Sequence, residues 1–281
     1  YMTPRGYHPR AVNSGQAWTR TTALSFMNMP ILSYIAEISP RPVLFVHGAF
    51  VGAWCWDDHF LPYFAERGFA AHALSLRGHG RSGGFERLAG ASLDDYEADV
   101  QLVARHIGGP LAIIGHSMGA MILQRCLHKL DAVAAVLMAS VPPEGLLGSS
   151  MLLAARDPGL FAALSRIQHG PPDIETILAA RRAAFSDHLE EELVIRHLMR
   201  MQPESERAIL DLSWPQHFFI GRARHVPTMV VGADADAFFT RTMIHSTALV
   251  YGVAAEFFPD TAHAMMLERD WQRVADRIME W

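Results

Sequence analysis

Cysteine is scarce in this sequence, and the net charge is small. Only two of the 281 residues are cysteines, Cys55 and Cys126, which are too few for a disulfide framework. Cys126 falls in an apolar segment with helical spacing, so we expect a buried free thiol and, by default, a reducing compartment. The formal net charge of −5 gives no reason to expect a surface for nucleic acid.

Long hydrophobic runs are missing as well. No stretch of about 18 uninterrupted apolar residues occurs, so the sequence predicts no membrane span. Residues 1–20 are polar and carry three arginines, but no long apolar region follows them at the distance typical of a signal peptide. We therefore expect a cytoplasmic location, and an exported, processed form stays open as the alternative.

Half of the residues are hydrophobic, so a chain of this length can bury a large core. From residue 42 onward, short apolar runs typical of buried strands alternate with segments of helical spacing. This alternation predicts an α/β fold, with a mostly parallel central sheet flanked by helices. The expected strands are 42–46, 69–76, 111–114, 132–139, 227–231 and 254–258, and the expected helices are 57–68, 92–107, 120–127 and 271–281.

Two segments depart from the alternation. Residues 1–41 form an N-terminal extension of uncertain structure, within which SFMNMPILSYIAEIS (25–39) has a helix-like apolar pattern. Residues 144–224 carry apolar residues at helical spacing throughout. A helical block between two strands of one sheet predicts a cap inserted over the strand ends. The core then consists of residues 42–143 and 225–281.

The most informative motif is GHSMG at residues 115–119, which lies between the apolar run 111–114 and a helical segment. The pattern G-x-S-x-G between a strand and a helix is typical of a nucleophile elbow. Such a turn is sharp and strained, and it exposes the serine hydroxyl, here that of Ser117. Side chains at the two flanking positions would collide with neighbouring backbone, which explains glycine at Gly115 and Gly119.

Upstream of this motif, the string HGAFVGAWCW at residues 47–56 follows an expected strand. Together the two motifs resemble the α/β-hydrolase superfamily, and the string is similar to the oxyanion loop of plant methylesterases and hydroxynitrile lyases. The resemblance implies that the backbone N–H groups of Ala49 and Met118 form an oxyanion hole. It also implies that the aromatic side chains of Phe50 and Trp54 contact the substrate.

A serine hydroxyl needs a general base, and the base needs an orienting carboxylate. Composition cannot choose among 15 histidines, but the motif order of the family places the base after the last strand, at His263. The acid follows the preceding strand, where the pattern G-A-x-x-D favours Asp236 over Asp234. We expect Asp234 to cap the turn and Asp260 to be a loop-capping residue.

The string RGHGRS at residues 77–82 matches a turn that is common in the family. We interpret this loop as structural, and we expect His79 to be a surface or loop histidine rather than a ligand.

The resemblance implies an esterase-like or lipase-like serine hydrolase that uses no metal and no organic cofactor. We expect it to cleave a hydrophobic carboxylic ester through an acyl-enzyme intermediate, with this small molecule as its partner and a homodimer as a possible assembly. Thioesterase, amidase and C–C bond hydrolase activities stay open on the same triad. A hydroxynitrile lyase and a non-catalytic ligand-binding member of the fold are the alternatives from other classes.

Overall fold

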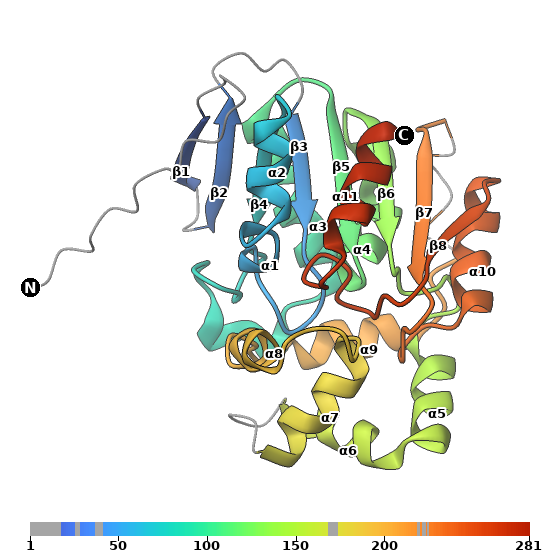
Figure 1. Cartoon of the computed structure of the whole chain (residues 1–281). Helices are drawn as coiled ribbons and strands as arrows, with labels where there is room; N and C mark the ends of the chain where they lie inside the picture. The colour runs from blue at the N-terminus through green and yellow to red at the C-terminus, as the bar shows by residue number, and fades with distance from the viewer. Residues whose placement is uncertain are drawn as a thin grey trace, which may run out of the picture.

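The computed structural model describes residues 18–25, 29–36, 42–167, 174–217, 220, 223 and 225–281. Eight strands within these residues form one sheet in the order β1-β2-β4-β3-β5-β6-β7-β8 (Figure 1). The six strands from β4 to β8 in this order are parallel, so the predicted mostly parallel α/β fold is confirmed. The strands are β1 (Trp18–Ser25), β2 (Met29–Ala36), β3 (Pro42–Val46), β4 (Ala70–Leu74), β5 (Leu111–His116), β6 (Ala132–Met138), β7 (Thr228–Ala233) and β8 (Ala255–Phe258).

Helices cover both faces of the sheet, which is why its central strands are almost wholly apolar. Alternate residues of β3 face opposite sides: Phe45 packs in the core beneath α1, α2 and α11, whereas Leu44 packs in the core beneath α3, α4 and α10. Cys55 and Cys126 are both buried and free, as we expected for Cys126. These helices are α1 (Trp54–Asp57), α2 (Phe60–Glu66), α3 (Leu93–Ile107), α4 (Met118–Cys126), α10 (Arg241–Tyr251) and α11 (Trp271–Glu280).

A group of helices follows β6 and precedes β7, and Figure 1 shows it beyond the carboxyl ends of the strands. Each regular element described within residues 144–224 is helical, as the apolar spacing predicts. We call these helices, together with the described loops that join them, the cap. Its helices are α5 (Leu146–Arg156), α6 (Pro158–Ile167), α7 (Ile174–Ala184), α8 (Glu191–Leu198) and α9 (Glu206–Ser213).

The N-terminal segment corrects one expectation. The helix predicted over residues 25–39 is wrong, because β2 runs antiparallel to β4, with Ile31 opposite Leu74 and Tyr34 opposite Ala71. A short apolar run fits either a helix or a strand. Here the backbone edge of β4 offers hydrogen bonds that only a strand can complete. The remainder of that prediction, at 26–28 and 37–39, lies outside the described residues.

Candidate active site

Ser117 lies in the turn between β5 and α4, with backbone angles of φ 54° and ψ −118°. Positive φ is strained for any residue other than glycine, and such strain is typical of functional turns. A Cβ atom on Gly115 would lie 2.8 Å from the Cα atom of Ala120, and one on Gly119 would collide with the carbonyl oxygens of Val46 and His47. The two glycines are therefore required for β3, β5 and α4 to approach so closely.

His263 and Asp236 meet although 27 residues separate them. Asp236 follows β7 and His263 follows β8. The Oδ2 atom of Asp236 lies 2.8 Å from the Nδ1 atom of His263. The other carboxylate oxygen of Asp236 accepts hydrogen bonds from the backbone N–H groups of Phe238 at 2.8 Å and Phe239 at 3.0 Å. Because these two backbone donors hold the carboxylate in place, it can fix the orientation of the imidazole ring.

The two other aspartates near this turn do not reach His263. Asp234 forms an ion pair with Arg241 at the surface. Asp260 is exposed and occupies a left-handed conformation with φ 56° in the turn after β8. The structure therefore brings Asp236, and not Asp234, to the candidate base.

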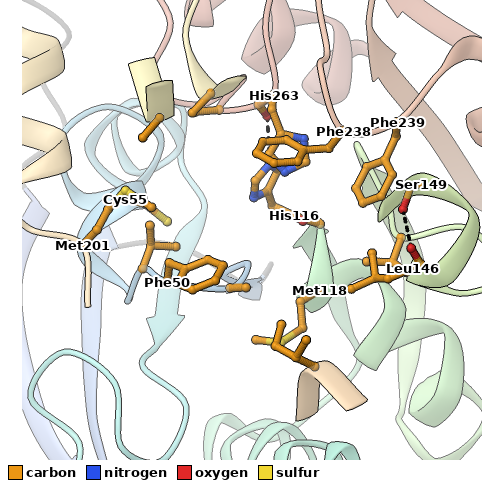
Figure 2. Close-up of a pocket in the computed structure, with 18 of the residues that line it drawn as sticks. Phe50, Cys55, His116, Met118, Leu146, Ser149, Met201, Phe238, Phe239 and His263 are labelled. Carbon is orange, nitrogen blue, oxygen red and sulfur yellow. Dashed lines mark hydrogen bonds between the residues drawn. The ribbon is translucent and has the colours of Figure 1, made fainter. Parts of the chain in front are cut away.

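A cavity of about 460 Å³ lies between the core and the cap, and Ser117 and His263 both line it. The residues predicted at the oxyanion hole and substrate contacts, Ala49, Met118, Phe50 and Trp54, line it as well. Figure 2 shows Phe50, Cys55 and Met201 on one side of His263, and Leu146, Ser149 and Phe239 on the other. Further apolar side chains from the cap complete the wall; among them are Leu153, Phe161, Ala180, Ala184, Phe185, Ile209 and Leu212.

His116, within the GHSMG motif, is a residue that the sequence analysis missed. Its Nε2 atom lies 2.9 Å from the carbonyl oxygen of His263, and since a carbonyl only accepts, Nε2 carries the proton. Burial lowers the pKa of His116 well below its usual value, and the electrostatic effect of the neighbouring His263 lowers it further. A neutral His116 thus tethers the backbone of the candidate base. Its position next to Ser117 was the available signal.

His79 corrects part of a second expectation: it lies in the loop 77–82, as predicted, but it is fully buried and not at the surface. Its Nε2 atom lies 3.0 Å from a carboxylate oxygen of Glu204, which is also fully buried and belongs to the cap. The two residues are 125 positions apart, and nothing in the local pattern of the loop 77–82 predicts this pairing. Glu204 was missed for the same reason.

Buried neutral histidines lead to a prediction about stability in acid. Burial lowers the pKa of His47 to about 3 and that of His72 to about 4, and it lowers that of His116 as well. Below pH 6.5 the unfolded chain binds protons at these positions and the folded protein does not, so stability falls as the pH falls. Each histidine contributes a slope of about 1.4 kcal/mol per pH unit between pH 6.5 and its folded pKa.

Urea denaturation at pH 7.5, 6.0 and 5.0 measures this slope. We expect the free energy of unfolding to decrease steeply from pH 7.5 to pH 5.0. His72→Asn removes one of the titrating groups, so it should reduce the slope by about 1.4 kcal/mol per pH unit. An equal free energy of unfolding at pH 7.5 and 5.0 would show that these histidines are protonated in the folded state.

The sheet, the turn at Ser117 and the cap define an α/β-hydrolase fold. The sequence profile of the Alpha/beta hydrolase family matches residues 43–277, and the chain belongs to that family. The esterase EaEST of Exiguobacterium antarcticum has a similar structure, with a TM-score of 0.73 at 15% identity, covering 93% of this chain and 98% of that one.

Two curated relatives match shorter parts of the chain. The uncharacterized protein PA2218 of Pseudomonas aeruginosa is 63% identical over 73 residues, which are 26% of this chain and 18% of that protein. The bifunctional esterase/perhydrolase DCH of Acinetobacter calcoaceticus is 36% identical over 119 residues, which are 39% of this chain and 41% of that protein. The chain thus spans less than half the length of either relative.

Two kinds of feature do not occur in the described part of the chain. None of its helices is long and apolar enough to cross a membrane. None of its histidine, cysteine, aspartate and glutamate side chains gather in a group of three or more that could hold a metal ion.

Proposed function

We propose that this protein is a serine hydrolase that cleaves a hydrophobic carboxylic ester through an acyl-enzyme intermediate. The observation that carries the proposal is the 2.8 Å contact between His263 and Asp236 beside the cavity that Ser117 also lines. Nucleophile, base and orienting acid are the three groups that acyl transfer by serine requires.

The reaction has two halves. The hydroxyl of Ser117 attacks the ester carbonyl as Nε2 of His263 accepts its proton, and Asp236 keeps the other ring proton on Nδ1. The backbone N–H groups of Ala49 and Met118 stabilise the resulting oxyanion. When the C–O bond breaks, His263 protonates the leaving alcohol. A water molecule, deprotonated by His263, then hydrolyses the acyl-enzyme and releases the acid and free Ser117.

The lining of the cavity supports an uncharged, hydrophobic substrate. Apolar and aromatic side chains, Phe50 and Trp54 among them, make up most of its wall. A charged acyl group would lose its hydration against this apolar wall, whereas an apolar one gains about 0.8 kcal/mol per buried methylene.

Perhydrolysis is a second candidate function, favoured by the similarity to an enzyme named as both esterase and perhydrolase. It would use the same acyl-enzyme, with hydrogen peroxide in place of water as the acyl acceptor and a peracid as the product.

A substrate panel tests these proposals. We expect the purified protein to hydrolyse p-nitrophenyl esters from C2 to C12, and to act less well on the matched thioesters and p-nitroanilides. Parallel assays with hydrogen peroxide measure peracid release. A better rate on thioesters or anilides would replace the ester proposal with one of the other acyl transfers, and turnover of none of them would contradict a hydrolase.

The two sides of the cavity are expected to hold the two substituents of the ester. Leu146→Trp and Met201→Trp would each narrow one side. Two panels of esters test this, one varied in the length of the acyl chain and the other in the length of the alcohol. We predict that each variant lowers kcat/KM for the longest substrates of one of the two panels. The expected loss is about 1–3 kcal/mol of transition-state binding, the range for methylene discrimination in an apolar pocket.

The matched control is Met151→Trp, since Met151 lies on α5 like Leu146 but is 66% exposed. It should leave both panels unchanged, and the smallest ester should be hydrolysed at a similar rate by all three variants. A uniform loss over every chain length would mean that these positions only support the fold.

A further inference from the structure

The oxyanion loop is held by a part of the cap that does not take part in the proposed chemistry. Phe50 has φ 66°, a conformation that a non-glycine residue rarely adopts. Its backbone carbonyl accepts a hydrogen bond from the N–H of Gln202 at 2.9 Å, and its own N–H donates to Oε2 of Glu204 at 3.4 Å. Both polar backbone groups of the strained residue are therefore satisfied by residues about 150 positions away.

Glu204 is itself fixed by buried donors. Its Oε1 atom accepts hydrogen bonds from the hydroxyl of Tyr96 and the backbone N–H of Ser205, both at 2.7 Å. Its Oε2 atom accepts from Nε2 of His79 at 3.0 Å as well as from Phe50. Each carboxylate oxygen is thus committed to two donors.

His79 faces two acceptors, which determines its charge. Nδ1 lies 3.0 Å from the carbonyl oxygen of Arg77, and Nε2 lies against the carboxylate of Glu204, so both ring nitrogens must carry protons. Burial alone would lower the pKa of His79, but the charge and hydrogen bond of Glu204 outweigh it and raise the pKa. The pair is a buried imidazolium and carboxylate.

We propose that Glu204 is a positioning residue for the oxyanion hole. By holding the N–H of Phe50, it fixes the backbone of the loop that presents the N–H of Ala49, one residue earlier, to the substrate. The inference rests on the proposed function, because it concerns the oxyanion of that reaction. An oxyanion hole stabilises the transition state only when its donors are already oriented.

Glu204→Gln tests this with the smallest change in shape. The two strong donors at Oε1 keep the remaining oxygen of the amide on that side, so the NH₂ group takes the place of Oε2 and cannot accept from Phe50. We expect kcat to fall about 10- to 100-fold, less than the loss of a whole oxyanion donor, with KM within about threefold of the wild type. Affinity for a trifluoromethyl ketone, which forms an oxyanion on the serine, should fall by the same factor as kcat.

The matched control is Glu97→Gln. Glu97 is also a buried, ion-paired carboxylate, held by Arg125 at 2.5 Å and Lys129 at 2.9 Å, but it does not line the cavity. It should lose stability without a change in kcat or in ketone affinity. Equal kcat losses in the two variants, or unchanged ketone affinity in Glu204→Gln, would overturn the proposal.

Two further measurements keep the test decisive. Tyr96→Phe removes one donor to Glu204 and should lower kcat about two- to tenfold with KM unchanged. This variant replaces Glu204→Gln as the test of the positioning role if Glu204→Gln does not fold. Hydrogen exchange of residues 48–51 should be faster in the Glu204 variant than in the Glu97 variant, whether or not the protein hydrolyses esters. An absence of turnover in the wild type would therefore contradict the proposed function, whereas unchanged exchange at residues 48–51 would contradict the positioning role.

Discussion

Ser117→Ala is expected to abolish ester hydrolysis, with a loss in kcat of about 10⁵- to 10⁶-fold. The reason is that the proposed acyl-enzyme cannot form without the hydroxyl at the turn between β5 and α4. The variant should also lose covalent labelling by a fluorophosphonate. Ser117 adopts φ 54°, which alanine tolerates about as poorly as serine, so we expect little change in the free energy of unfolding.

Ser149→Ala is the matched control for this experiment. Ser149 lines the same cavity, but its hydroxyl donates to the carbonyl oxygen of Leu146 at 3.0 Å within the first turn of α5. Labelling should persist in this variant and map by mass spectrometry to Ser117. An adduct on another residue, or labelling that persists in Ser117→Ala, would refute the assignment of the nucleophile.

Asp236→Asn should lower kcat about 10⁴-fold while leaving the fold intact. The backbone N–H groups of Phe238 and Phe239 would hold the amide oxygen, so the NH₂ group would face Nδ1 of His263. Nδ1 would then have to accept a hydrogen bond, and the ring proton would move to Nε2. His263 would present a donor to Ser117 where the reaction needs an acceptor.

Asp234→Asn is the control for the loss of kcat that we expect in Asp236→Asn. Asp234 lies in the same turn and pairs with Arg241 at the surface, where an ion pair contributes about 0–1 kcal/mol. We expect kcat within about twofold of the wild type. Measuring kcat for both variants at one pH above the pKa of a free histidine tests the assignment, and a reversed order of effects would make Asp234 the orienting acid.

The cap is attached on both sides of the candidate site. On the oxyanion side it contributes Gln202 and Glu204, as described above. On the histidine side, Glu268 accepts hydrogen bonds from the backbone N–H of Ser186 in the cap at 2.6 Å and from that of Ala262 at 3.2 Å. The cap is therefore hydrogen-bonded to both loops, which is why cavity variants need controls on the same helix.

The sequence by itself determined the parts of the site whose geometry is local. Two glycines around Ser117 are required wherever a strand turns so sharply into a helix, so the motif alone predicts the turn. The motif order of the family that the sequence resembles predicted Asp236 and His263 in the loops after the last two strands. These loops lie together because parallel strands end at the same edge of the sheet.

Only the tertiary structure decided the features that depend on distant partners. Residues 29–36 are a strand because β4 offers them an edge, and His79 is buried because a cap residue 125 positions away supplies a carboxylate. On α5, Leu146 lines the cavity and Met151 faces solvent, although both are equally apolar in the pattern. Local spacing records which residues are apolar or titratable, but burial and charge follow from what the folded chain places beside them.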